Sequence, residues 1–253
     1  MNLTIAVPRG ALLGEALDLL DRLEVDTTEI RSNDRKLVFP DIGVITMRPS
    51  DIPSYVEHGA ADVGITGRDV LAEQSCRDVY ELLDLGFGAC RMIVAVHEDG
   101  DPLAESLRRL GRVRIATKYP RVAAAHFAAT GRQAEIVEVK GSVEIAPLTG
   151  LADGIVDLVA TGRTLAENRL VEREPIFEST ARLIALRAHV LCDLADLGFD
   201  GRSAGHKRAQ VARDSRRAAQ VREILGGETL ELHLRPRREG RGCARAARRY
   251  GRP

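Results

Sequence analysis

The stretch "GLADGIVDLVATGRTLAE", residues 150–167, combines an apolar run with two carboxylates and a Thr-Gly-Arg-Thr loop. An earlier stretch, "GAADVGITGRDVLAE" at residues 59–73, repeats the same order: Gly-x-Ala-Asp, an apolar run, Thr-Gly-Arg and then Leu-Ala-Glu. Both stretches are typical of a buried strand that turns directly into a helix. A repeat of this kind, about 90 residues apart, indicates two related halves.

Short apolar runs alternate with helical patterns along much of the chain. Strands are predicted at 3–7, 42–47, 62–66, 91–96, 113–117 and 134–139, and helices at 12–23, 51–59 and 121–130. Alternation of this kind predicts an α/β fold with mainly parallel sheets. Two such lobes place a small-molecule site in the cleft between them. The glycine-containing segment 83–91 is predicted to cross between the lobes.

Composition and charge limit the possible functions. The chain has 253 residues, 44% of them hydrophobic, and a formal net charge of zero, so the whole protein is not expected to bind nucleic acid. Residues 191–253 hold 15 Lys or Arg against 8 Asp or Glu, which leaves 22 against 29 in residues 1–190. This basic tail is expected to be partly helical, over roughly 207–225, or disordered, as its last twenty residues are expected to be.

Cysteine spacing and the absence of long apolar runs indicate a cytoplasmic protein. The four cysteines form no CxxC pair, so free thiols in a reducing compartment are expected rather than a zinc or redox site. The sequence starts without a signal-peptide pattern, and no apolar run approaches the ~20 residues that span a bilayer. No association with a membrane is expected.

The loop after residue 160 is a candidate phosphate site. Thr161 and Thr164 offer hydroxyl donors, Gly162 permits close backbone approach, and Arg163 either adds charge or points to solvent. Asp153 and Asp157 lie four residues apart, on one face of a strand, where both could reach a cleft. Together these groups suit a phosphorylated ribose, with the carboxylates on hydroxyl groups or on magnesium. The alternative is a strand, a turn and an N-capped helix without a ligand.

Three further charged residues follow predicted elements. Glu144 belongs to a short helical segment before the second repeat. It is either a hydroxyl or magnesium contact, or else a capping-box partner or a surface residue. Arg9 ends the first strand and Arg48 ends another, which places each for a polyphosphate. Either arginine could instead pair with a surface carboxylate.

Several long, ordered motifs across residues 2–187 resemble one family, the ATP phosphoribosyltransferases of histidine biosynthesis. The motifs are "IAVPRGALL", "RKLVFPD", "RPSDIPSYVEHGAADVGITGRDVL", "VYELLDLGFGACRMIVAV", "RIATKYP", "GSVEIAPLTGLADGIVDLVATGRTLAENRLVE" and "STARLIA". The resemblance implies two lobes similar to the type II periplasmic-binding-protein fold. Lobe one would comprise 1–88 and 170–190, lobe two 89–169, and the tail 191–253.

The resemblance also implies the reaction: the 5-phosphoribosyl group of phosphoribosyl pyrophosphate passes to N1 of ATP, with magnesium as cofactor. Lobe two would bind phosphoribosyl pyrophosphate, and lobe one would bind ATP. Magnesium would be held through substrate phosphates, with Glu144 and Asp157 as possible ligands. The implied phosphoribosyl pyrophosphate contacts are Glu144, Asp153, Asp157, Thr161, Gly162, Arg163, Thr164 and Leu165, and the implied ATP contacts are Arg9, Gly10 and Arg48. No side chain is expected to act as a nucleophile.

Two departures from the family pattern concern ATP binding and regulation. The family often has Pro-Lys-Gly-Arg-Leu where this chain has Pro-Arg-Gly-Ala-Leu at residues 8–12, so one basic contact is absent at Ala11. Residues 191–253 do not resemble the regulatory domain of the long form. The chain therefore resembles the short form, which implies a homo-oligomer, a complex with a regulatory subunit similar to histidyl-tRNA synthetase, or both.

Three other functions fit part of the sequence. A binding protein could use the same two lobes without chemistry, and a different phosphoribosyltransferase could act on a free base. A nucleic-acid module could use the basic tail, but no aromatic residues are interleaved with its charges as stacking on bases would require.

Overall fold

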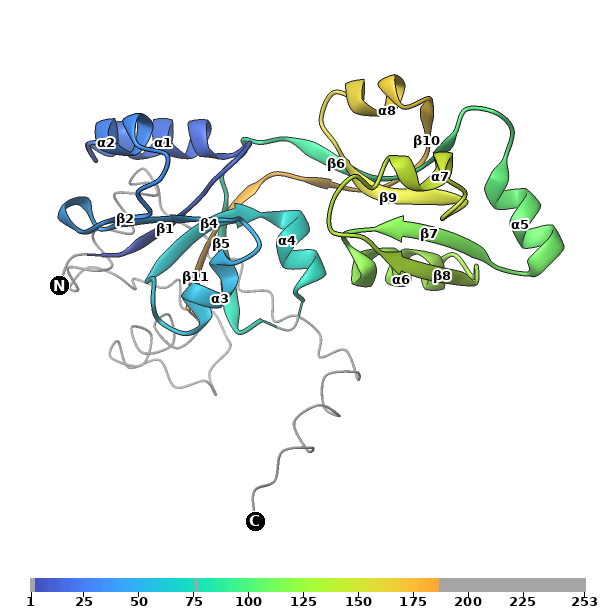
Figure 1. The fold of residues 1–253 in the computed structure, drawn as a ribbon. Helices are drawn as coiled ribbons and strands as arrows, with labels where there is room; N and C mark the ends of the chain where they lie inside the picture. The colour runs from blue at the N-terminus through green and yellow to red at the C-terminus, as the bar shows by residue number, and fades with distance from the viewer. Residues whose placement is uncertain (1–2, 76, 187–253) are drawn as a thin grey trace, which may run out of the picture.

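Two lobes joined by two extended segments make up the described part of the chain. The computed structural model describes residues 3–75 and 77–186 (Figure 1). Each lobe is built on one β-sheet, with strand order β2-β3-β1-β4-β11-β5 in lobe one and β10-β6-β9-β7-β8 in lobe two. The predicted two-lobed α/β class is confirmed.

Lobe one holds the N-terminal half of the described chain and one returning strand. Its strands are β1 (Ile5–Pro8), β2 (Val38–Phe39), β3 (Val44–Met47), β4 (Val63–Gly67), β5 (Val79–Asp84) and β11 (Ala181–Leu186). Its helices are α1 (Leu13–Arg22), α2 (Thr28–Ser32), the 3-10 helix η1 (Pro40–Ile42), α3 (Ile52–Glu57) and α4 (Arg68–Glu73).

Lobe two follows the same alternation of strands and helices. Its strands are β6 (Cys90–His97), β7 (Val113–Thr117), β8 (Ala134–Glu138), β9 (Gly154–Val159) and β10 (Leu170–Ser179). Its helices are α5 (Pro102–Leu110), α6 (Pro120–Ala129), α7 (Ile145–Leu148) and α8 (Arg163–Glu167). Both copies of the sequence repeat therefore form a strand followed by a helix, β4–α4 in lobe one and β9–α8 in lobe two.

Each sheet contains three neighbouring parallel strands, and its remaining pairs are antiparallel. Strands β3, β1 and β4 run parallel in lobe one, and strands β8, β7 and β9 run parallel in lobe two. The strands that enter or leave a lobe, β6, β10 and β11, pair antiparallel with their neighbours. Parallel pairs carry the crossover helices that the sequence alternation predicts.

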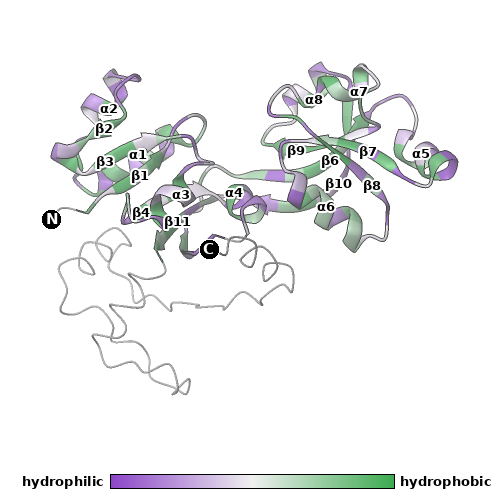
Figure 2. Ribbon diagram, turned by 60° about the horizontal axis from the view of Figure 1, so that its bottom comes forward, coloured by the Kyte–Doolittle hydropathy of each residue, from purple (hydrophilic) through white to green (hydrophobic). Residues whose placement is uncertain are grey.

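Helices cover both faces of each sheet, and side chains alternate between the two faces. In β1, Ile5 and Val7 pack with α1, whereas Ala6 packs with α3 on the opposite face. Lobe two follows the same rule, with one apolar cluster under α5 and α6 and another under α7 and α8. Figure 2 shows apolar residues along the strands of both sheets and hydrophilic residues over much of α2.

The second connection between the lobes lies further along the chain than the sequence predicted. Residues 170–179 were assigned to lobe one, but they form β10, which pairs with β6 of lobe two from Leu170 to Ser179. The chain returns to lobe one at Thr180, because Ala181 already pairs with Gly67 of β4. The first connection, residues 85–89, joins β5 to β6.

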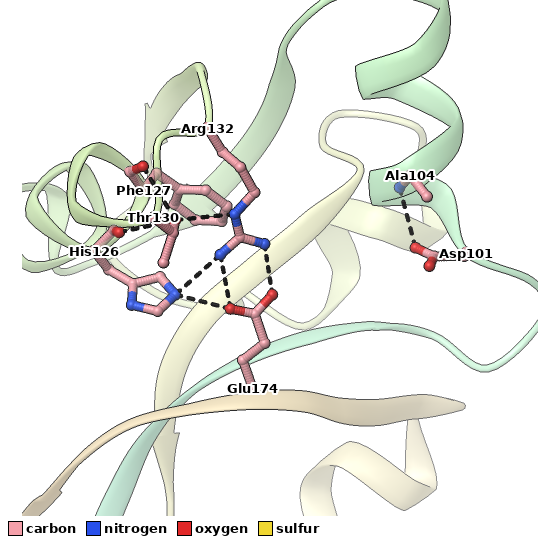
Figure 3. A network of polar contacts seen from close by, with 7 residues as sticks. All are labelled: Asp101, Ala104, His126, Phe127, Thr130, Arg132 and Glu174. Carbon is pink, nitrogen blue, oxygen red and sulfur yellow. Dashed lines mark hydrogen bonds and ion pairs between the residues drawn. The ribbon is translucent and has the colours of Figure 1, made fainter.

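A charged cluster fastens β10 to α6 within lobe two (Figure 3). Glu174 accepts hydrogen bonds from both terminal nitrogens of Arg132, at 2.5 and 2.7 Å, and lies 3.0 Å from Nε2 of His126. The guanidinium of Arg132 also lies over the ring of Phe127, 4.6 Å from its centroid. The guanidinium, with His126, lowers the pKa of Glu174. This cluster, together with the pairing of β10 and β6, holds β10 in lobe two.

The predicted helix at 207–225 and the basic tail lie outside the described residues.

Candidate functional site

Asp157 lies in β9 on the face that α7 and α8 cover. It shares that face with Ile155 and Val159, which pack in the cluster beneath those helices. Asp157 is only 8% exposed, although a carboxylate is costly to bury unless it is paired. A buried acidic side chain in the middle of an apolar strand therefore needs a specific partner.

Lys118 is that partner, and it comes from the end of the neighbouring strand β7. Its Nζ lies 3.3 Å from Oδ1 of Asp157, which also accepts a 2.8 Å hydrogen bond from the backbone N–H of Leu158. Burial raises the pKa of Asp157, and the charge of Lys118 opposes that rise. The Lys118 side chain is 41% exposed, so solvent or a ligand can reach this pair.

Glu144 adds a second carboxylate to the same place. It precedes the first residue of α7, and its side chain makes no capping hydrogen bond to that helix. Its charge also raises the pKa of Asp157, although less than burial does. Glu144, Asp157 and Lys118 thus bring two negative charges and one positive charge to the α7–α8 side of lobe two.

The Thr-Gly-Arg-Thr loop follows β9 and leads into α8. Gly162 precedes α8 with a φ of +79°, a left-handed conformation that glycine adopts without strain. Thr161 and Thr164 are exposed, and the Thr161 hydroxyl lies 3.5 Å from the N–H of Arg163. This geometry leaves the hydroxyls of the loop open to a ligand.

Two residues assigned to this loop have side chains that serve the helix or the core. Arg163 pairs with Glu167 one turn later on α8, with 2.8 Å between Nε and Oε1. Leu165 is 7% exposed and packs in the apolar cluster beneath α7 and α8. Only the backbone of Leu165 is available to a ligand.

Asp153 is not brought together with the other predicted groups. It precedes β9, whereas Thr161 follows the end of that strand, so the two residues lie at opposite ends of β9. Its Oδ2 accepts a 2.7 Å hydrogen bond from the backbone N–H of Arg114, and its Oδ1 lies 3.4 Å from the guanidinium of the same residue. The expectation that Asp153 and Asp157 share one cleft is therefore corrected, because Asp153 joins the start of β9 to β7.

Arg9 and Arg48 lie side by side at the carboxyl ends of β1 and β3. Pro8 pairs with Met47, and the N–H of Arg9 donates a 2.8 Å hydrogen bond to the carbonyl of Met47. The Arg9 guanidinium donates to the carbonyl of Asp34, whereas Arg48 is exposed. Gly10 follows with a φ of +85°. Parallel strands place these groups at one edge of the lobe-one sheet, which is a frequent ligand position.

A cavity of about 310 Å³ opens beside this edge. Its charged lining residues are Arg9, Arg31, Lys36 and Asp34, and its polar ones include Asn33 and Thr46. Arg31 is ion-paired with Asp18 and Asp21, and Lys36 with Glu29. Thr46 is 3% exposed, and among the described residues its hydroxyl has no hydrogen-bond partner. With three cations against one carboxylate in its lining, the cavity is a candidate site for an anionic ligand.

Sequence reasoning missed three cations of these sites. Lys118 directly follows the predicted strand 113–117, so its position at a strand end was a usable signal. Arg31 and Lys36 flank a loop without such a signal, and only the folded structure brings them to the cavity beside Arg9.

The described residues hold no group of three or more His, Cys, Asp or Glu that could bind a metal ion. Within the same residues, no helix is both long enough and apolar enough to span a membrane.

Comparisons with known proteins agree on one family. A family model for ATP phosphoribosyltransferase, named HisG, matches residues 48–197. A protein of Rubrobacter xylanophilus named ATP phosphoribosyltransferase is 48% identical over 214 residues, covering 81% of this chain and 99% of that protein. One from Moorella thermoacetica with the same name is 50% identical over 192 residues, covering 73% of this chain and 84% of that protein.

A solved structure supports the same assignment. The chain matches one chain of the ATP phosphoribosyl transferase (HisG:HisZ) complex from Thermotoga maritima with a TM-score of 0.65 and 28% identity. The match covers 89% of this chain and 95% of that one. On these matches, together with the two-lobed fold, the chain belongs to the ATP phosphoribosyltransferase family, whose reaction is the first step of histidine biosynthesis.

Proposed function

We propose that lobe two holds phosphoribosyl pyrophosphate and lobe one holds ATP while this ATP phosphoribosyltransferase transfers the 5-phosphoribosyl group to N1 of ATP. The observation that carries this division is the group Glu144, Asp157 and Lys118 beside the Thr161–Thr164 loop. A phosphorylated sugar requires hydroxyl acceptors next to phosphate donors, and this side of lobe two offers both.

On the phosphoribosyl side, the loop binds the 5′-phosphate. Thr161 and Thr164 donate their hydroxyls, and the backbone around Gly162 approaches the phosphate closely. Asp157 and Glu144 accept hydrogen bonds from the ribose hydroxyls. Lys118 opposes the rise in the pKa of Asp157 and adds positive charge near the pyrophosphate.

On the ATP side, the cavity beside β1 and β3 is the binding surface. Its positive lining, with Arg9 at its edge, favours the triphosphate. The nearby Gly10 and the exposed Arg48 complete the predicted contacts. Ala11 offers no charge, so Arg9 carries a larger share of the ATP contact than a Lys-Gly-Arg sequence would require.

The reaction needs alignment rather than a covalent intermediate. The lone pair of adenine N1 forms the new bond to the anomeric carbon while the bond from that carbon to the pyrophosphate oxygen breaks. The carboxylates near the ribose stabilise the positive charge that develops on the sugar, and the cations stabilise the departing pyrophosphate. Holding both reactants in line supplies much of the rate enhancement.

Magnesium fits this site as an ion shared with the substrate. Glu144 and Asp157 supply the oxygen donors that magnesium prefers, and the remaining ligands would be phosphate oxygens and water. When bound, the ion neutralises pyrophosphate charge and makes it a better leaving group.

The partner and location follow from the family and the substrates. We expect a hetero-oligomer with a HisZ-type regulatory subunit, because the matched Thermotoga maritima structure is a HisG:HisZ complex. We expect the enzyme to work in the cytoplasm, where ATP and phosphoribosyl pyrophosphate are made.

Calorimetric titration tests the division of the substrates. Phosphoribosyl pyrophosphate is titrated into the wild-type protein and into Thr161→Ala, with and without magnesium, and ATP is titrated in parallel. We expect magnesium to strengthen binding of phosphoribosyl pyrophosphate, and Thr161→Ala to weaken that binding but not ATP binding. Equal affinity of both proteins for phosphoribosyl pyrophosphate would refute the assignment of the loop.

A further inference from the structure

Helix α4 of lobe one presents one face to lobe two. Asp69, Ala72 and Glu73 are spaced three and four residues apart, so they share a face of the helix. Ala72 packs against the apolar cluster of lobe two beneath α5 and α6. Helices α4 and α6 are in contact across the lobes. Figure 1 shows α4 on the side of lobe one that is nearer to lobe two.

Glu73 caps the first turn of α6. Its carboxylate accepts hydrogen bonds from the N–H of Arg121, at 3.0 and 3.1 Å, and from the N–H of Val122, at 3.0 Å. A helix begins with N–H groups that lack partners within the helix, and a carboxylate satisfies them well. Here the capping group belongs to the other lobe, so the cap also joins the two lobes.

Asp69 makes a second, buried link to lobe two. Its Oδ2 accepts a 2.9 Å hydrogen bond from the Tyr119 hydroxyl, and its Oδ1 accepts one of 3.1 Å from Ser179. Asp69, Tyr119 and Ser179 are 7%, 8% and 2% exposed. Burial raises the pKa of Tyr119, so its hydroxyl remains a donor at neutral pH. Ser179 ends β10, so this network also includes a connection between the lobes.

Tyr119 directly follows Lys118, which belongs to the candidate phosphoribosyl site. The Thr117 hydroxyl accepts a 2.9 Å hydrogen bond from the Tyr119 N–H and donates one of 2.6 Å to the carbonyl of Val156 in β9. These two bonds fix the turn that carries Lys118, whose Nζ lies 3.3 Å from Asp157. The face of α4 is therefore connected to the site through short, buried contacts.

We propose that Glu73 and Tyr119 are positioning residues that set the alignment of the two lobes for phosphoribosyl transfer. Glu73 holds α6 against α4, and Tyr119 holds the end of β7 against Asp69. The proposal rests on the proposed function, because it assumes that each lobe holds one reactant. Displacing one reacting group by a small distance lowers the rate without removing either substrate.

The test compares Glu73→Ala, Glu73→Gln, Tyr119→Phe and the double variant Glu73→Ala/Tyr119→Phe. The full chain is assayed for kcat and both KM values, with calorimetric Kd values for phosphoribosyl pyrophosphate with magnesium and thermal unfolding of each variant. The matched controls are Glu105→Gln on α5 and Tyr55→Phe on α3, which change exposed residues away from α4 and α6.

We expect kcat to fall roughly 3- to 30-fold in Glu73→Ala and Tyr119→Phe, as for contacts that couple two sites. The Kd for phosphoribosyl pyrophosphate should stay within roughly threefold of wild type, since lobe two alone holds that substrate. Glu73→Gln keeps one oxygen acceptor and should recover part of the kcat lost in Glu73→Ala. The double variant should lose less kcat than the product of the single losses, because both residues hold the same contact.

Two results would overturn the proposal. A kcat within roughly twofold of wild type in both single variants would show that the contacts of Glu73 and Tyr119 do not align the reactants. This holds even if the variants unfold at a lower temperature. An equal loss of kcat and of affinity for phosphoribosyl pyrophosphate would instead place the effect inside lobe two. Wild-type protein that forms no product would refute the proposed function before any variant is compared.

Discussion

Replacing Asp157 with asparagine separates the catalytic role of its charge from its structural cost. Asparagine keeps the size of the side chain, so the strand and the cluster beneath α7 and α8 should be preserved. A hydrogen bond from a substrate hydroxyl to a charged acceptor contributes about 1.5–3 kcal/mol. At about 1.36 kcal/mol per tenfold, kcat/KM for phosphoribosyl pyrophosphate should fall roughly 10- to 200-fold.

The stability of the protein should not fall with activity, because burial disfavours the charged form of Asp157. Burial raises the pKa of Asp157 in the folded state, so the stability linked to its proton is complete below the unfolded value and is lost as the pH rises through the folded value. Above the folded value that stability is gone, and removing the charge there should leave Tm unchanged or raise it. A gain of 1 kcal/mol would raise Tm by about 2–4 °C in a protein of this size.

The two readouts are the rate of phosphoribosyl-ATP formation and thermal unfolding at pH 7. Lys118 loses its partner in this variant, but its side chain is 41% exposed and water can solvate the charge. Asp99→Asn is the control, since Asp99 is 69% exposed in an ion pair with Arg169. Wild-type kcat/KM in Asp157→Asn would refute the reasoning, and so would a loss of activity matched by a large fall in Tm.

Three other variants test the remaining assignments. Thr161→Ala should raise KM for phosphoribosyl pyrophosphate and leave KM for ATP unchanged, as measured from initial rates with each substrate varied in turn. A raised KM for ATP alone would contradict the assignment of the loop. Arg9→Ala should raise KM for ATP, because it removes a cation from the lobe-one cavity. A change confined to KM for phosphoribosyl pyrophosphate would reverse the assignment of the two substrates to the two lobes. Glu174→Gln should lower the free energy of unfolding by about 1–2 kcal/mol at pH 7, since its partly exposed charge pairs with Arg132 and His126. Arg132, with His126, lowers the pKa of Glu174 in the folded state. The difference in free energy of unfolding between the two proteins should therefore shrink as the pH falls below the pKa of the unfolded state and through that of the folded state. Denaturant titrations that give the same difference at every pH would contradict this prediction.

Local patterns in the sequence were enough to predict most elements that carry the site. Continuous apolar runs marked β1, β3, β4, β6, β7, β8 and β9, and the Gly-x-Ala-Asp repeat marked the two strand–helix units. The same pattern predicted that Arg9 and Arg48 each follow a strand, and the structure shows that these two strands are parallel neighbours.

The remaining features depend on contacts between distant parts of the chain. Strand β10 carries charges and Pro175 among exposed positions, so it lacks a clear apolar period, and the boundary was placed at 170 instead of Thr180. Asp153 was assigned to the site because its spacing from Asp157 matches one strand face, but its partner Arg114 lies 39 residues earlier. No local pattern could reveal that pairing.

The most direct measurement is phosphoribosyl-ATP formation by the purified chain. ATP, phosphoribosyl pyrophosphate and magnesium are supplied, pyrophosphatase removes the second product, and absorbance is followed with and without a HisZ-type subunit. The account predicts product formation that stops in the absence of magnesium and accelerates with the regulatory subunit. Binding of phosphoribosyl pyrophosphate without any product, with or without that subunit, would contradict the account.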